Sequence, residues 1–235
     1  APQIGATGNG FIFSKQQTAT VTGTVATRAY DGTNWATVAG LGLSGLNGDV
    51  LSQIQVTGAV FQDPNAANAG VNKPVADGIG SFQFVDKNGK PVYGYTKQSA
   101  LQGTITPANL IVSTTVVTKT YDGGLSALGT AVATDETTLY ARGFGGPQDF
   151  LSGGIFAFKD RNAGSGKAVT TSNVTVNDGN GGGNYAVTYV DNTTSTITPA
   201  NLTLTTANVA KTYDGGFGAL GTAVATNDTT LFSPD

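Results

Sequence analysis

The side chains on which most enzyme chemistry depends are absent from this sequence. Its 235 residues include no cysteine and no histidine, and its single glutamate is Glu136. Cysteine and serine–histidine nucleophiles, tetrahedral zinc sites and histidine proton transfer are therefore excluded. Paired aspartates could act as in glycoside hydrolases, but nothing distinguishes any aspartate pair here from turn residues. We expect a protein that is not an enzyme and that needs no cofactor.

Two further chemistries have candidate residues. Asp178, in a run of asparagines and glycines, offers the hard oxygen ligand that calcium takes, but the run lacks EF-hand spacing and is also typical of an Asx turn. Lys119 and Lys211 occupy equivalent positions and could form an isopeptide bond with asparagine, but Arg28 stands at that position earlier in the chain. We expect no metal site. The alternative is a calcium site with Asp178 as a ligand.

Exposed aromatic side chains are the candidates for binding. Trp35 is the only tryptophan, and its indole could stack on a sugar ring or pack between modules. Phe144 and Phe150 lie in a glycine-rich stretch that has no close counterpart elsewhere in the chain. This stretch is either a contact patch for a neighbouring chain or an ordinary variable loop.

Composition limits the partners. The 34 glycines, the many threonines and the 11% of charged residues are typical of an all-β protein with many turns. A formal charge of −3 without basic clusters argues against nucleic acid and anionic membranes as partners. No apolar run approaches the roughly 20 residues of a membrane span, so no membrane insertion is expected.

The chain is a tandem array. Residues 197–232 repeat residues 105–140 with identity at 25 of 36 positions, at an offset of 92 residues. A third, more divergent copy of the central motif surrounds Tyr30. A period of this length is too long for a solenoid coil and suits a small domain that folds by itself.

The period and two prolines that end strand-like runs divide the chain into segments. Pro107 and Pro199 each follow a threonine-rich run, and proline cannot continue a strand ladder. We expect short, stiff junctions there and an elongated molecule. The expected segments are residues 1–13 as the tail of a preceding repeat or a donor strand, 14–106 as repeat 1, 107–198 as repeat 2, and 199–235 as an incomplete repeat 3.

Alternation of β-branched and small residues predicts the strands. Residues 41–50 are expected to form a loop with one helical turn. The predicted fold is all-β, with tandem β-sandwich or β-grasp-like modules of about 92 residues arranged end to end. The expected strands are 18–25, 54–61, a hairpin of 82–85 with 92–95, 103–106, 110–118, 153–158, 168–176 and 184–190.

One Tyr-Asp-Gly triplet occurs in each copy. Asp-Gly between apolar runs predicts a tight turn, because both residues tolerate positive φ. The tyrosine is expected to pack on the adjoining strands. Recurrence in every copy indicates a structural role for Tyr30, Asp31 and Gly32, for Tyr121, Asp122 and Gly123, and for Tyr213, Asp214 and Gly215.

Four ordered motifs resemble the YDG repeat domain: residues 119–123, 158–167, 183–185 and 197–202. Repeat 1 departs from the pattern, with Arg28 for lysine and Tyr93 expected as the counterpart of Tyr185. Such repeats occur in large bacterial surface proteins resembling filamentous haemagglutinin, exported by two-partner or related type V secretion. The resemblance implies a secreted or cell-surface adhesin stalk, with roles in cell adhesion and biofilm, and no catalytic residues.

The two ends of the chain suggest an assembly. Residues 1–13 resemble the last strand of a repeat, and residues 199–235 the first strands of another. Copies of the protein could join head to tail by strand complementation into a filament, or these limits could be arbitrary. The expected partners are copies of itself or adjacent repeats, and host or matrix glycans if the aromatic residues form a carbohydrate-binding module.

Overall fold

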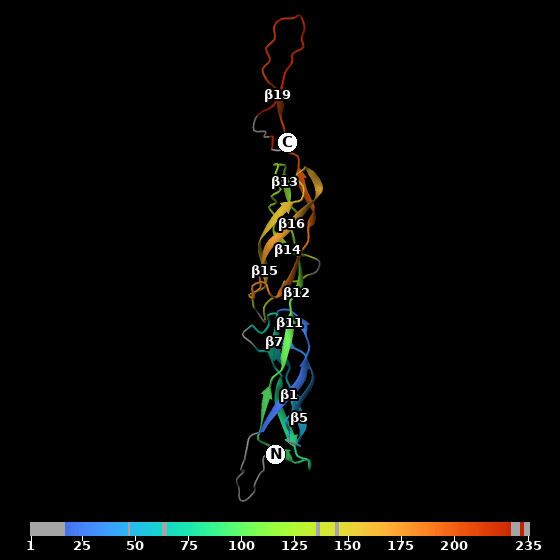
Figure 1. Cartoon of the computed structure of the whole chain (residues 1–235), viewed down its shortest axis with the longest axis vertical. Helices are drawn as coiled ribbons and strands as arrows, with labels where there is room; N and C mark the ends of the chain where they lie inside the picture. The colour runs from blue at the N-terminus through green and yellow to red at the C-terminus, as the bar shows by residue number, and fades with distance from the viewer. Residues whose placement is uncertain are drawn as a thin grey trace. The chain divides into compact units, whose positions relative to one another are not determined.

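The structure is a computed structural model that describes residues 17–46, 48–62, 65–134, 137–143, 146–226 and 231–232 (Figure 1). Within these residues the chain forms strands and turns and no helix, which confirms the all-β prediction and fits tandem β modules. Two compact units divide it differently from the sequence repeats. Unit 1 is Ala1–Leu110, Thr137–Phe150 and Val176–Val187, and unit 2 is Ile111–Glu136, Leu151–Thr175 and Thr188–Asp235.

Repeat 1 supplies most of unit 1. Its strands form three sheets, with the orders β10-β1-β4, β2-β11-β7-β6-β3 and β5-β8-β9. The strands are β1 (Gln17–Val25), β2 (Arg28–Ala29), β3 (Trp35–Ala36), β4 (Val38–Ser44), β5 (Val50–Val56), β6 (Ala59–Phe61), β7 (Gly70–Ala76), β8 (Ile79–Val85), β9 (Pro91–Val92), β10 (Tyr95–Ser99) and β11 (Gln102–Thr106).

The strands of repeat 2 form two sheets, with the orders β14-β12-β17 and β13-β18-β16-β15. Two more strands, β19 (Leu204–Thr206) and β20 (Ala223–Ala225), pair with each other in the third copy. The strands of repeat 2 are β12 (Ala108–Thr114), β13 (Thr118–Thr120), β14 (Ala131–Thr134), β15 (Phe150–Phe158), β16 (Gly164–Asn177), β17 (Tyr185–Tyr189) and β18 (Asn192–Thr198).

Each unit has an apolar core made of inward-facing strand residues. Phe61, Phe84 and Ile105 are almost fully buried in unit 1. In unit 2, Phe158 and Ile197 are buried with their neighbours, and Tyr121 packs against this cluster. Burial of side chains of this size stabilises each unit by roughly 1.5–3 kcal/mol per residue.

The structure corrects three details of the predicted strands. The expected loop at 41–50 begins as the strand β4, and the expected strand 54–61 is split into β5 and β6. The split falls at Gly58, where φ is +107°, a value that ends a strand. The run 110–118 is also divided, into β12 and β13.

Two repeats share a strand register that identifies their equivalent residues. The Gln17 N–H donates to the Gly94 carbonyl at 3.1 Å, and the Ala108 N–H donates to the Asn184 carbonyl at 2.9 Å. Asn184 and Gly94 are therefore equivalent, and each precedes a tyrosine that begins a strand. The counterpart of Tyr185 is thus Tyr95, and the prediction of Tyr93 was wrong by two residues.

Candidate functional site

The Tyr-Asp-Gly triplet forms the same turn in all three copies. The aspartate carboxylate accepts a hydrogen bond from the backbone N–H two residues ahead, which is an Asx turn. The glycine follows at a φ that only glycine adopts without strain, +78° at Gly32, +73° at Gly123 and +79° at Gly215. The Asx bonds are Thr33 N to Asp31 Oδ1 at 2.8 Å, Gly124 N to Asp122 Oδ1 at 2.9 Å, and Gly216 N to Asp214 Oδ1 at 2.9 Å.

A basic residue two positions before the tyrosine closes the turn. Lys119 Nζ donates to Asp122 Oδ1 at 2.6 Å and to the Gly124 carbonyl at 2.8 Å. Lys211 makes the equivalent bonds in the third copy, and Arg28 pairs with Asp31 at 2.5 Å. The lysine ammonium lowers the pKa of the Asp122 carboxyl. These lysines thus bind a carboxylate and carbonyls, the partners of a turn.

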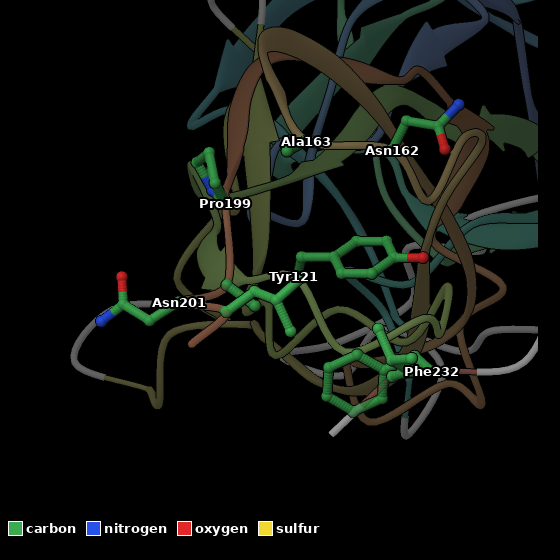
Figure 2. A pocket seen from close by; sticks show the side chains of 9 residues that line it. Tyr121, Asn162, Ala163, Pro199, Asn201 and Phe232 are labelled. Atoms are coloured by element: carbon green, nitrogen blue, oxygen red, sulfur yellow. The ribbon is translucent and has the colours of Figure 1, made fainter. Parts of the chain in front are cut away.

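The backbone of each complete repeat holds its tyrosine at the end of the last strand. The Tyr30 N–H donates to the Thr106 carbonyl at 2.8 Å, and the Tyr121 N–H donates to the Thr198 carbonyl at 2.8 Å. The rings differ in exposure: Tyr30 is 1% exposed and Tyr213 is 92% exposed. Tyr121 is intermediate and lines an open pocket of about 370 Å³ (Figure 2).

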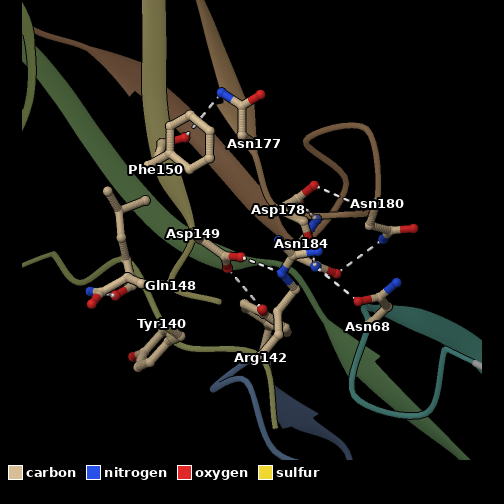
Figure 3. A network of polar contacts seen from close by, with 12 residues as sticks. Asn68, Tyr140, Arg142, Gln148, Asp149, Phe150, Asn177, Asp178, Asn180 and Asn184 are labelled. Atoms are coloured by element: carbon tan, nitrogen blue, oxygen red, sulfur yellow. Dashed lines mark hydrogen bonds and ion pairs between the residues drawn. The ribbon is translucent and has the colours of Figure 1, made fainter. Parts of the chain in front are cut away.

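Asp149 explains why Tyr30 is buried. Within unit 1, its carboxylate Oδ2 accepts hydrogen bonds from the Tyr30 hydroxyl and from the Tyr185 hydroxyl, each at 2.8 Å. Arg142 Nε lies 3.1 Å from Asp149 Oδ1 as an ion pair (Figure 3). Asp149 is 1% exposed, so this buried charge depends on these partners.

Two other tyrosine rings pack against the Tyr30 ring. Tyr30 meets Tyr185 edge-to-face with a centroid distance of 5.4 Å, and meets Tyr140 in the same way at 5.8 Å. The pKa of Tyr30 is raised well above its usual value, mainly by burial and next by the hydrogen bond to Asp149. Burial also raises the pKa of Tyr185. The predicted packing of the tyrosine on adjoining strands was therefore incomplete, because its ring packs on two other tyrosines.

The loop before β17 is organised by Asp178. Its Oδ1 accepts hydrogen bonds from the backbone N–H groups of Asn180 at 2.7 Å and Gly182 at 2.8 Å, and its Oδ2 accepts one from Asn184 at 2.8 Å. In the described part of the chain, no group of three or more acidic, histidine or cysteine side chains is placed to hold a metal ion. Asp178 acts here as a turn former.

Asn184 connects that loop to repeat 1 through hydrogen bonds. Its Oδ1 accepts from the Ala69 N–H at 2.8 Å, and its Nδ2 donates to Asn68 Oδ1 at 3.1 Å (Figure 3). The loop that supplies these partners is longer in repeat 1. It has the extra residues Ala67, Asn68 and Ala69, whereas Ala163 in repeat 2 is followed directly by Gly164. We call the contacts of Tyr30, Asn68 and Ala69 with Arg142, Asp149, Asn184 and Tyr185 the repeat joint.

Two of the other candidates, Trp35 and Phe150, are not among the residues of the repeat joint. Trp35 is 52% exposed and Phe150 is 55% exposed, so both side chains are accessible. Phe144 lies outside the residues that the structure describes. Sequence analysis missed Asp149 and Asn184 as partners of repeat 1, although the Gly183-Asn-Tyr185 motif was a signal for the second of them.

Comparison with known proteins identifies one family. A family model described as the YDG domain matches residues 15–96 and 106–195. No curated protein and no solved structure gives a significant match. Within the described residues, no helix is long and apolar enough to cross a membrane.

Replacing Gly32 with alanine should destabilise the repeat joint more than the same change at Gly89. The two glycines have similar φ, +78° and +75°, so the backbone strain of about 1–2 kcal/mol is matched. A Cβ at Gly32 would lie 2.0 Å from the Ala141 carbonyl oxygen, whereas nothing lies within 4 Å at Gly89. Denaturant unfolding should show an extra loss of about 2 kcal/mol for Gly32→Ala. Equal losses would mean that residue 141 does not approach Gly32.

Tyr30→Phe tests the buried hydroxyl. At neutral pH it should lower the free energy of unfolding by about 1.5–3 kcal/mol, as expected for a hydrogen bond to a charged group. Because folding raises the pKa of Tyr30, its contribution is complete below the unfolded pKa of about 10 and is lost as pH rises through the folded value. Above pH 10, the free energy of unfolding should therefore fall less steeply with pH in the variant than in the wild type. The difference between the two slopes should be about 1.4 kcal/mol per pH unit.

The matched control for this variant is Tyr93→Phe, since the Tyr93 ring is 58% exposed. Its free energy of unfolding at neutral pH should stay within about 0.5 kcal/mol of the wild type. An alkaline stability profile that is the same for Tyr30→Phe and the wild type would contradict the buried tyrosine–carboxylate bond.

Proposed function

This chain belongs to the YDG-domain family, and we propose from that membership that it is a structural repeat region of a bacterial cell-surface or extracellular adhesin or fibre. Its repeats serve as a stiff stalk that carries other parts of the protein away from the cell. By resemblance, the parent proteins are adhesins like filamentous haemagglutinin, exported by two-partner or related type V secretion.

The repeat joint is the observation that carries this proposal. A stalk has to transmit force from one repeat to the next, and a flexible linker does not resist bending. In this chain a buried carboxylate and a buried asparagine, both from repeat 2, hold side chains and backbone of repeat 1. In the proposed stalk, these contacts couple the two repeats mechanically.

The residue composition supports the same function. The recurring motif residues build turns, and the turn lysines are occupied by carboxylate and carbonyl groups. A chain without cysteine can fold after export without thiol chemistry. Secretion to the cell surface, cell adhesion and participation in biofilm follow as parts of the proposal.

Pulling the full chain from its two ends in a single-molecule experiment tests the proposed function. We expect the wild-type chain to resist extension until it unfolds, and we expect Asp149→Asn to unfold at lower force. Removing one partner of a buried ion pair costs about 3–5 kcal/mol. Asp160→Asn is the control, because that side chain is 51% exposed and its ion pair with Lys167 is worth at most about 1 kcal/mol. Extension of the wild type at the low forces that stretch an unfolded chain would contradict a stalk.

The alternative function is binding of carbohydrate by exposed aromatics. The observation in its favour is Trp35, which is 52% exposed on the short strand β3. Indole rings bind the faces of sugars by stacking. Screening the full chain against immobilised glycans should then give saturable binding that Trp35→Ala removes and Tyr93→Phe retains. Absence of binding in the wild type would leave the stalk as the proposed function.

A further inference from the structure

We propose that the repeat joint is an oxidation site, at which a one-electron oxidant joins the rings of Tyr30 and Tyr185 by a covalent carbon–carbon bond. The product, a dityrosine, would tie repeat 1 to repeat 2 covalently in a chain that has no cysteine for a disulfide. This modification goes beyond the proposed function, because the bond can form whether or not the chain is a stalk.

The residue types of the chain direct oxidation to its aromatic side chains. The sequence has no cysteine and no methionine, the sulfur side chains that oxidants attack first, and it has one tryptophan and eight tyrosines. Two tyrosines that each lose one electron can couple, whereas phenylalanine has no hydroxyl proton to give up. Two tyrosine rings in contact are therefore the arrangement from which such a bond forms.

Both phenol groups of the proposed pair meet on a single carboxylate oxygen. Tyr30 and Tyr185 each donate to Asp149 Oδ2 at 2.8 Å, so their hydroxyl oxygens lie no more than twice that distance apart. The two ring centroids are 5.4 Å apart, at an interplanar angle of 77°. The ring carbons beside the hydroxyls are the carbons that couple in a dityrosine, and they belong to ring ends that converge on this oxygen.

Asp149 provides the proton acceptor that the oxidation requires. A phenol that loses an electron becomes a strong acid, so its proton leaves together with the electron. The Asp149 carboxylate is 1% exposed and already accepts the hydrogen bond of each phenol, so each proton has to move along one hydrogen bond only. The Tyr185 oxygen also accepts the Tyr140 N–H at 2.8 Å, and this bond can persist in the radical.

Tyr140 is the route by which an electron leaves the buried pair. Tyr30 is 1% exposed and Tyr185 is 6% exposed, so an oxidant in solution does not reach them directly. The Tyr140 ring is half-buried and lies nearly parallel to the Tyr185 ring, with a centroid distance of 6.5 Å. It also meets Tyr30 edge-to-face at 5.8 Å. An oxidised Tyr140 can therefore take an electron from either ring of the pair.

The reaction balances with a peroxide as the final oxidant. Each tyrosine gives up one electron and one phenolic proton, and the two radicals couple through the carbons beside their oxygens. The hydrogens on those two carbons then move to the oxygens, which restores both hydroxyl groups. Overall one C–C bond forms and two C–H bonds break. The two electrons break the O–O bond of the peroxide, and the two protons pass to its fragments or to water.

A second aspartate–tyrosine pair gives a comparison within the same chain. Tyr95 donates to Asp49 Oδ2 at 2.8 Å, in the same way as Tyr185 donates to Asp149. The ring of Phe84 meets Tyr95 at a centroid distance of 4.6 Å. The same hydrogen bond is thus combined with a ring that does not couple, and we expect no bond from Tyr95 to Phe84.

Brief illumination of the full chain with ruthenium tris-bipyridine and persulfate, a peroxide, tests the proposed site. Digestion and mass spectrometry of the monomer fraction should give a linked peptide pair that joins Tyr30 to Tyr185 and has lost two hydrogen atoms. Tyr185→Phe should lose this pair. Tyr140→Phe should form it severalfold more slowly and, because the ring is kept, with little change in melting temperature. Tyr93→Phe is the control and should keep the wild-type rate, since that ring is 58% exposed and lies outside the cluster.

Exposed tyrosines supply the competing result. Tyr213 is 92% exposed, so its radicals should join separate molecules in a yield that rises with protein concentration. The bond between Tyr30 and Tyr185 should form at a rate that does not depend on concentration. In the pulling experiment, the linked chain should release a shorter length, because the segment between the two tyrosines can no longer extend. Bonds found only between molecules, or equal rates in Tyr140→Phe and the wild type, would overturn oxidation of the joint through this cluster.

Discussion

The repeat joint depends on the hydrogen bonds and the ion pair of the buried Asp149 carboxylate. A carboxylate taken out of water is costly unless hydrogen bonds and an opposite charge replace the water. Here two tyrosine hydroxyls and Arg142 supply that replacement, and one of the hydroxyls belongs to the preceding repeat. The burial of Tyr30 follows from satisfying this charge, and so does the position of Tyr185 at the start of β17.

The Tyr-Asp-Gly motif combines two tasks at adjacent positions. Aspartate and glycine, with the preceding lysine or arginine, make a turn that is complete in itself and forms even in the third copy, where Tyr213 is 92% exposed. In the first copy, the tyrosine next to this turn, Tyr30, places its ring against residues of repeat 2. A local structure thus presents a side chain whose partner is distant in sequence.

This division explains what the sequence could predict. The turns at Asp31, Asp122 and Asp214 depend on neighbours in the chain, so their pattern revealed them, and the 92-residue offset revealed the tandem organisation. The repeat joint depends on residues 119 positions apart, as with Tyr30 and Asp149, and no local pattern reports such a pair. For the same reason the register of Tyr95 was missed, since it is fixed by the pairing of β10 with the distant strand β1. The predicted repeat boundaries stay predictions.

The longer loop of repeat 1 gives the repeat joint contacts that the equivalent loop of repeat 2 has no residues to make. Asn68 and Ala69 hold Asn184, and the shorter loop of repeat 2 has no residues at those positions. Tandem repeats that are nearly identical can exchange strands while they fold and become trapped in misassembled forms. A loop that only repeat 1 has, and that holds a residue of repeat 2, favours the pairing of these two repeats over such an exchange.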